Sequence, residues 1–170
     1  LEASVGFLSL SDARNQRETL HGVFAGSWRM LSAEQQGALG RLSVFVKFFD
    51  TAAAAGAAGV PVRTLFELER KGLIVRSSLG RFAMHVMVKE YARGKLDAGE
   101  AAGVRRQHAH YFLGALRANM QGRAFEARGA VLEQLRQDYV EVRAAWLHAV
   151  KSAEHALIGD SIEPLCYFLY

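Results

Sequence analysis

The sequence predicts a mainly α-helical chain that carries one small β-hairpin, and three observations lead to this fold class. Most of the chain places apolar residues three and four positions apart, which is the spacing of one helix face. Only residues 73–85 combine β-branched residues, alternation and a glycine turn, as a hairpin does. No strand pattern follows residue 97, so antiparallel helical hairpins are expected from there onward.

Three or four helices are expected before the hairpin. Asn15 can cap the first of them, and Ser32 with Gln35 forms a capping box that starts the next. The apolar positions of these two helices are Leu20, Val23, Phe24, Trp28, Leu31, Leu39, Leu42, Phe45 and Val46. Asp50 can cap a short alanine-rich helix that ends at Gly59.

The hairpin follows one more helix. Pro61 suits the first turn of that helix, and Gly72 suits the left-handed position after its end. The two strands are predicted at residues 73–77 and 81–85, with Gly80 in the turn between them. Helices followed by such a two-stranded wing form the element order of a winged helix.

The chain is therefore predicted to contain a linker at residues 1–13, a winged-helix domain at residues 14–97 and a helical unit at residues 98–170. The wing leads into a helix whose apolar positions are Val88, Tyr91, Ala92 and Leu96. The sequence around Asp97 breaks that helix before the helical unit begins.

The helical unit resembles the start of a repeat array. Residues 100–120 predict one long helix, and a later apolar series fits either one long helix or two helices joined near Asp138. That apolar series consists of Leu132, Leu135, Tyr139, Val142, Trp146 and Ala149. Residues 156–170 predict a last helix with an uncovered apolar end, so we expect a truncated array. Its end should be covered either by self-association or by folding back, through Leu165, Tyr167, Phe168 and Leu169.

Composition excludes several classes of protein. With 170 residues, of which 51% are hydrophobic, the chain can build a packed core. No apolar run approaches the roughly 20 residues that span a bilayer, and the N-terminus lacks a signal-peptide pattern, so a cytoplasmic location without membrane contact is expected. Cys166 is the only cysteine, and its apolar neighbours predict a buried thiol instead of a nucleophile.

No constellation of residues predicts catalysis. The chain lacks the glycine and lysine spacing of a P-loop, so it should not hydrolyse ATP by itself. His108 and His110 are two positions apart on a predicted helix and point to different faces, which excludes a shared metal ion. The sequence thus predicts no catalytic residue, no metal ligand and no cofactor within this chain.

DNA binding is an alternative, because a helix before a wing can enter a major groove. Under this alternative the DNA contacts would come from Arg63, Arg70, Lys71, Arg76 and Arg81. However, the 21 basic and 17 acidic residues are interspersed and leave a net charge of only +4. Glu67 and Glu69 also lie on the candidate helix and repel phosphates, so DNA binding is the less favoured interpretation.

Residues 14–150 resemble the module that follows the nucleotide-binding domain in STAND-class signal-transduction ATPases, which include bacterial transcriptional regulators. The most specific segments are Ser27-Trp28 to Leu31-Ser32, Leu42-Ser43-Val44-Phe45, KEYARGKL at residues 89–96 and RRQHAHYF at residues 105–112. The resemblance implies a winged helix that acts as a lid on nucleotide bound by the preceding domain. It also implies tetratricopeptide-like repeats that sense a protein or small-molecule signal, with ADP or ATP bound only by the parent protein.

The resemblance also implies a role for one histidine. In related NB-ARC proteins a Met-His-Asp motif closes the wing, and its histidine contacts the β-phosphate of ADP. Met84 and His85 match the first two positions, whereas Val86 replaces the acidic residue. His85 is therefore a candidate nucleotide-phosphate sensor, and the alternative is a half-buried histidine whose ring is satisfied by the backbone.

These observations predict a non-catalytic regulatory fragment that couples nucleotide state to a sensing helical scaffold. The alternatives are a winged-helix DNA-binding transcriptional regulator and a protein-interaction scaffold with no nucleotide link.

Overall fold

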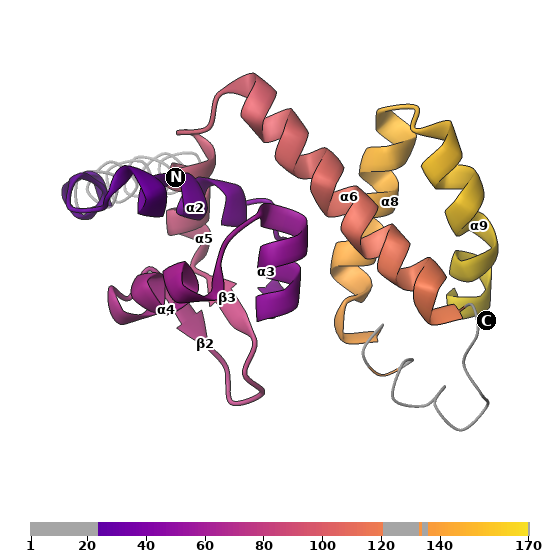
Figure 1. Ribbon diagram of the computed structural model, residues 1–170, viewed down its shortest axis with the longest axis horizontal. Coiled ribbons are helices and arrows are strands. Elements are labelled where there is room, and N and C mark those ends of the chain that lie inside the picture. The colour runs from indigo at the N-terminus through magenta and orange to yellow at the C-terminus, as the bar shows by residue number, and fades with distance from the viewer. Residues whose placement is uncertain (1–23, 121–132, 134–135, 170) are drawn as a thin grey trace, which may run out of the picture.

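The computed structural model describes residues 24–120, 133 and 136–169, and it confirms a mainly helical fold with a small antiparallel sheet (Figure 1). A helical segment at residues 24–29 comes first. The elements after it are α2 (Ala33–Leu42), β1 (Phe48–Phe49), α3 (Thr51–Ala58), α4 (Val62–Arg70), β2 (Ile74–Arg76), β3 (Phe82–Met84), α5 (Val86–Arg93), α6 (Ala98–Met120), α8 (Tyr139–Lys151) and α9 (His155–Leu169). The linker predicted at residues 1–13 and the helix start predicted at Asn15 lie outside the described residues.

Capping residues confirm the predicted helix starts in the first half. The Ser32 hydroxyl accepts the Gln35 backbone N–H at 3.2 Å, and the Gln35 side chain accepts the Ser32 N–H at 3.3 Å. Asp50 caps α3 by accepting the Ala53 N–H at 2.7 Å. Gly59 ends α3 with a φ of 62°, a left-handed conformation that glycine adopts without a Cβ clash.

The wing consists of β2, β3 and the turn between them, and it has a third strand that sequence reasoning missed. β3 lies in the middle of the sheet and pairs antiparallel with both β1 and β2. Gly80 has a φ of 76° in the turn, as predicted. Phe48 and Phe49 form only two residues of strand, which is too short for an alternating pattern to be recognised.

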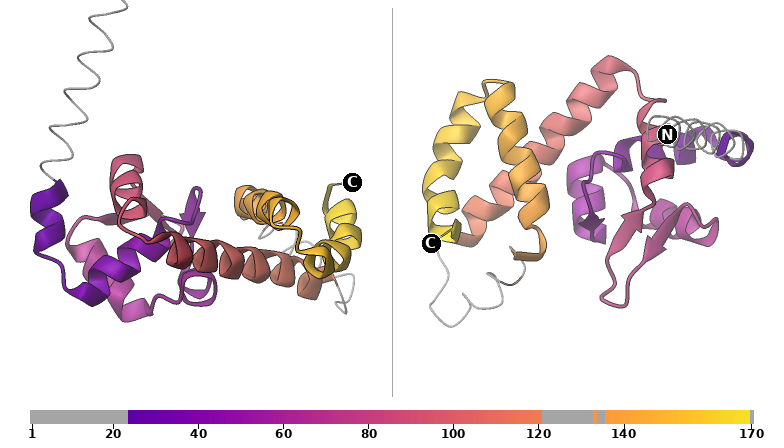
Figure 2. Two further views of the ribbon diagram at one scale, coloured as in Figure 1. Left: turned by 90° about the horizontal axis from the view of Figure 1, so that it is seen from above. Right: turned by 180° about the vertical axis from the view of Figure 1, so that it is seen from behind.

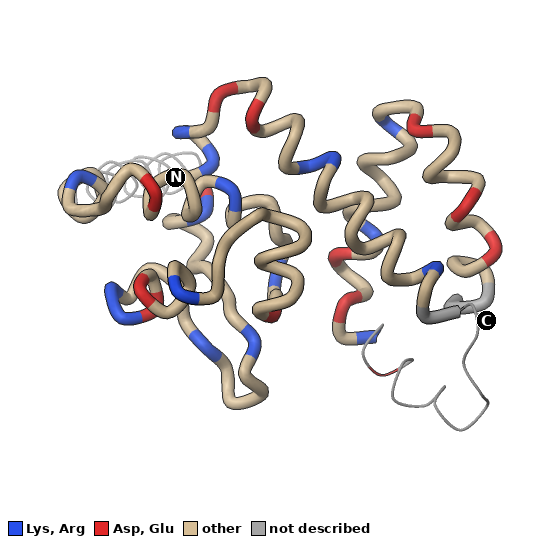
Figure 3. The backbone as a smooth tube through the Cα atoms, in the orientation of Figure 1, with Lys and Arg blue, Asp and Glu red and all other residues tan. Residues whose placement is uncertain are grey.

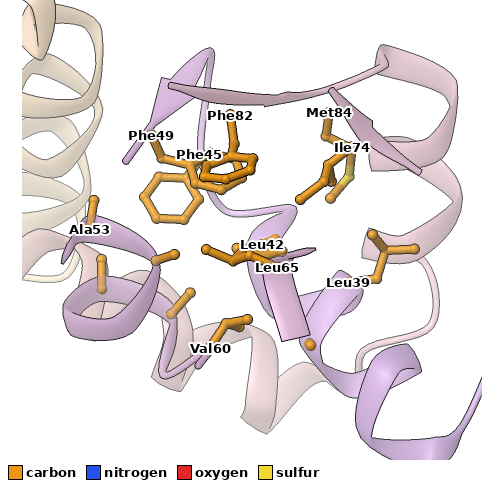
Figure 4. Close-up of a cluster of buried hydrophobic side chains, with 14 of the residues drawn as sticks. Leu39, Leu42, Phe45, Phe49, Ala53, Val60, Leu65, Ile74, Phe82 and Met84 are labelled. Carbon is orange, nitrogen blue, oxygen red and sulfur yellow. The ribbon is translucent and has the colours of Figure 1, made fainter. Parts of the chain in front are cut away.

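The core of the winged-helix unit, defined as α2 to α5 with the sheet, lies between its helices and the inner face of the sheet (Figure 4). The rings of Phe45 and Phe49 stack with centroids 4.4 Å apart, and Phe82 stacks next to Phe49 at 6.1 Å. The aliphatic side chains around these rings are Leu39, Leu42, Val60, Leu65, Ile74 and Met84. Phe45, from the loop between α2 and β1, and Phe49, from β1, thus complete the core.

Five predicted helix positions need correction. Leu31 lies after the first helical segment and Phe45 lies after α2, although both side chains are buried. Val46 is 46% exposed and lies after the end of α2, because Ser43 already caps that helix. Leu96 lies beyond the end of α5, although its side chain still packs close to Gly40. Tyr139 is exposed at the start of α8, where it begins the helix instead of facing inward.

The helical unit, defined as α6, α8 and α9, extends from the winged-helix unit along α6 (Figure 2). α8 and α9 both pack against α6 and against each other. Asp138 occupies the N-cap position of α8, which favours the predicted alternative of two helices joined near this residue. Within the described residues, no helix combines the length and apolar character needed to cross a bilayer.

α6 of the helical unit also packs on α3 of the winged-helix unit. A Cβ atom added to Gly56 of α3 would lie only 2.3 Å from the Tyr111 ring of α6. The Gln107 side chain also donates to the Gly56 carbonyl at 2.9 Å. The two helices therefore approach closely at a glycine, and α6 places the helical unit against the winged helix.

Candidate functional site

Two carboxylates near the start of α8 contact the winged-helix unit and define the candidate site. Asp138 precedes the helix, and Glu141 follows one turn later with only 1% of its surface exposed. Both reach residues that come 57 to 95 positions earlier in the chain. We call the residues that make these contacts the junction. They are Val46, Lys47, Phe48, Arg81, Lys89, His108, Asp138 and Glu141.

Glu141 accepts hydrogen bonds from two successive backbone groups. The Val46 N–H lies 2.8 Å from Oε1 and 3.0 Å from Oε2, and the Lys47 N–H lies 2.8 Å from Oε1. Successive N–H groups that converge on one acceptor form a concave site for anions. The buried carboxylate is therefore held by donors that belong to the loop between α2 and β1, which satisfies its requirement for partners.

His108 completes the surroundings of this carboxylate. Its Nε2 lies 2.9 Å from Glu141 Oε2, and the ring is 3% exposed. Because the carboxylate oxygens accept from every other neighbour, Nε2 is the donor in this pair. The rings of Phe45 and Phe112 pack against the imidazole with centroids 5.6 Å and 4.7 Å away and fix its orientation.

Lys89 of α5 contacts the same loop from the other side. Its Nζ donates to the Val46 carbonyl at 2.7 Å. Burial lowers the pKa of Lys89, and the nearby Glu141 carboxylate acts in the opposite direction by favouring the ammonium. α5 and α8 therefore hold one loop between a cation and an anion.

Arg81, one of the predicted DNA contacts, forms the second half of the junction. Sequence reasoning placed it among possible DNA contacts, but the residue is 8% exposed and forms an ion pair with Asp138. Its guanidinium also donates to the Phe48 carbonyl at 3.1 Å and to Gln137 at 3.5 Å. Because it bridges β1 and the start of α8, Arg81 has no free face to offer a phosphate.

His85, the predicted phosphate sensor, lies outside the junction. It follows β3 directly and caps α5, where its Nδ1 accepts the Met87 N–H at 3.3 Å. The backbone contact agrees with one predicted alternative, but the ring is exposed and not half-buried. Since Nδ1 is the acceptor, Nε2 carries the proton and is a donor that faces away from this contact.

The remaining predicted DNA contacts are mostly engaged with the protein itself. Arg63 pairs with Glu67 and Arg76 pairs with Glu69, each at 3.0 Å. Lys71 donates to the Met30 carbonyl at 3.3 Å, and Arg70 is exposed. Figure 3 shows the basic and acidic residues interspersed over both units.

Two other candidate positions are resolved by the helices that carry them. His108 is buried and His110 is exposed, which confirms that they point to different faces of α6. The described part of the chain contains no group of three or more His, Cys, Asp or Glu residues arranged to hold a metal ion. Cys166 was predicted to be buried but is exposed, because it lies one turn after the exposed Ile162 on the same face of α9.

Sequence reasoning missed the junction, although a signal for it existed. His108 and Glu141 each lie on the buried side of a helix, and a buried carboxylate requires a donor partner. Two polar residues at core positions of neighbouring helices therefore indicate a buried donor–acceptor pair. The backbone donors at Val46 and Lys47 give no such signal, because any residue type except proline supplies an N–H group.

Comparisons with known proteins give one structural likeness. No protein-family model and no curated protein matches this chain. The solved structure of a STAND protein with a tetratricopeptide repeat sensor from Pyrococcus horikoshii is similar, with a TM-score of 0.49 and 19% sequence identity. The match covers 87% of this chain and 27% of that protein, so this chain spans well under two thirds of its length.

Proposed function

We propose that this chain is a non-catalytic regulatory module of a STAND-type signal-transduction ATPase or transcriptional regulator. It couples the nucleotide state of a preceding domain to a helical scaffold that senses a protein or a small molecule. The observation that carries this proposal is the junction, in which Glu141 of the helical unit is buried against the loop before β1.

The chemistry of the junction favours coupling over simple packing. Buried charged groups add little net stability compared with well-packed apolar groups, but removing one partner is strongly unfavourable. The contacts of Glu141 and Arg81 therefore select one arrangement of the two units and oppose intermediate ones. A regulatory module needs this property, because its output depends on which of two arrangements is populated.

His85 supplies the proposed contact with nucleotide. Its ring is exposed at the start of α5, and its Nε2–H is directed away from the capping contact. A phosphate at this position would accept a hydrogen bond from the imidazole Nε2–H. Val86, which stands where the resembling motif has an acidic residue, is 56% exposed and adds no negative charge that would repel a phosphate.

The test uses the parent protein that contains this chain and its nucleotide-binding domain. His85→Ala should accelerate ADP release by about 10- to 100-fold, because a charge-assisted hydrogen bond contributes about 1.5–3 kcal/mol. His110→Ala is the matched control, since His110 is also exposed but lies on α6. Equal ADP release from both variants and the unmodified protein would remove His85 from the mechanism and leave the protein-scaffold alternative.

A further inference from the structure

The peptide group between Val46 and Lys47 contacts both units at once. Its N–H, which belongs to Lys47, donates to Glu141 at 2.8 Å, and its C=O, which belongs to Val46, accepts from Lys89 at 2.7 Å. A peptide group placed between an anion and a cation is polarised, and each of its hydrogen bonds strengthens the other. Loss of the Glu141 contact therefore also weakens the hold of this loop on Lys89.

Lys89 connects the loop to the helix that carries His85. The Lys89 backbone N–H donates to the His85 carbonyl at 3.0 Å, so the two residues are one helical turn apart in α5. A loop that moves with Glu141 consequently acts on the first turn of α5. His85 is the N-cap of that turn.

Arg81 provides a second connection to the same histidine. It immediately precedes β3, and His85 immediately follows that strand. β3 has three residues and is held on both sides by β1 and β2, so its two ends move together. Asp138 therefore holds one end of a short rigid strand whose other end is His85.

We infer that the peptide group between Val46 and Lys47 is a relay through which a displacement of the helical unit repositions His85. Asp138 and Glu141 lie one turn apart at the start of α8, so one movement of that helix releases both connections. The inference rests on the proposed function only in assigning His85 to a phosphate. The mechanical connection belongs to this chain alone and can be measured without nucleotide.

Two substitutions in this chain test the relay from its two sides. Glu141→Gln keeps the shape of the side chain but replaces an acceptor oxygen with an NH2 group, and Lys89→Met removes the ammonium but keeps an unbranched stem. Each should accelerate hydrogen exchange of the Lys47 amide by about tenfold, since the hydrogen bond from this amide to Glu141 is lost or weakened in both variants. Each should also shift the His85 imidazole resonances in the same direction.

The controls are Glu163→Gln and Lys151→Met, which change exposed residues of the helical unit. They should leave the Lys47 amide and the His85 resonances unchanged. The relay is overturned if Lys89→Met leaves the Lys47 amide at its original rate, or if Glu141→Gln leaves His85 unshifted. In Lys89→Met, equal acceleration of the Leu65 and Leu68 amides in α4 also overturns the relay, because the Lys47 amide then responds only to global unfolding. A failed ADP test together with a positive result here would refute the nucleotide contact and retain the relay.

Discussion

Glu141 and His108 form a buried pair between α8 and α6, with Nε2 2.9 Å from Oε2, and the same carboxylate also accepts two backbone N–H groups of the winged-helix unit. The imidazole, the carboxylate and the loop therefore satisfy one another where the two units meet. Because one carboxylate serves both the imidazole and the loop, its loss removes all of these contacts together.

Removal of the carboxylate should destabilise the fold strongly. Glu141→Ala leaves the buried His108 ring and the loop N–H groups of Val46 and Lys47 without their shared acceptor, which should lower the free energy of unfolding by about 3–5 kcal/mol. Urea unfolding followed by circular dichroism measures this change. Glu163→Ala, at an exposed position of α9, should remain within about 0.5 kcal/mol of the unmodified protein. If both variants lost the same free energy of unfolding, Glu141 would contribute no more to stability than an exposed glutamate does.

Because α3 and α6 approach closely at Gly56, replacing this glycine with alanine should change the stability in the opposite direction from the same replacement at Gly103. Alanine is intrinsically better than glycine in a helix by about 1 kcal/mol. At Gly56 the added methyl group would meet the Tyr111 ring at 2.3 Å, so Gly56→Ala should lower stability by about 1–3 kcal/mol through overpacking. At Gly103, where an added methyl group would have no atom within 4 Å, the same change should raise stability.

Thermal unfolding of both glycine variants provides the measurement. A second change at the contact, Tyr111→Ala, should remove most of the additional penalty of Gly56→Ala, because the methyl group then has space. The interpretation fails if Gly56→Ala is as stable as Gly103→Ala, or if Tyr111→Ala does not reduce the difference.

Local features could be predicted from the sequence because their chemistry lies within a few residues. The capping box of Ser32 and Gln35, the cap at Asp50 and the turn at Gly80 each depend on neighbours along the chain. The predicted hairpin has the same origin, whereas periodicity left open whether the chain breaks near Asp138. Periodicity also identified the long helix that became α6.

The features that could not be predicted depend on contacts between residues far apart in the chain, which the spacing of residues does not reveal. β1 forms because β3 offers it a free edge, and a strand of two residues has no periodicity of its own. The burial of Arg81 follows from Asp138, which is 57 positions away, so a basic residue near the wing could not be recognised as unavailable. The exposure of Cys166 likewise depends on which face of α9 packs on the helical unit.

The pKa of His148 makes stability depend on pH. Burial lowers this pKa below its ordinary value of 6.5, and the charge of Arg105 lowers it further, although Glu154 opposes the change. The unfolded chain therefore binds a proton at higher pH than the folded chain does. The contribution of neutral His148 to the free energy of unfolding is therefore fully present above pH 6.5. It is lost as the pH falls from 6.5 through the folded-state pKa.

His148→Gln should therefore reduce the loss of stability between about pH 7.5 and pH 5.5, because glutamine does not titrate. Urea unfolding at the two pH values measures the difference. His110→Gln is the matched control, since it removes an exposed histidine of the same unit and should leave the pH dependence almost unchanged. A pH dependence that is identical in the His148 variant and the unmodified protein would contradict this assignment.

DNA binding by this chain should be weak, without sequence preference and steeply dependent on salt. Arg76 is paired with Glu69 and Arg81 is buried against Asp138, whereas Arg63 stays exposed beside Glu67, so few of the predicted DNA contacts can replace counterions on a duplex. Fluorescence anisotropy with unrelated duplexes at several salt concentrations measures this directly. Arg63→Ala should weaken all complexes alike, because a phosphate contact carries no base information. A salt-resistant complex with one duplex that Arg63→Ala selectively abolishes would instead establish groove recognition by α4.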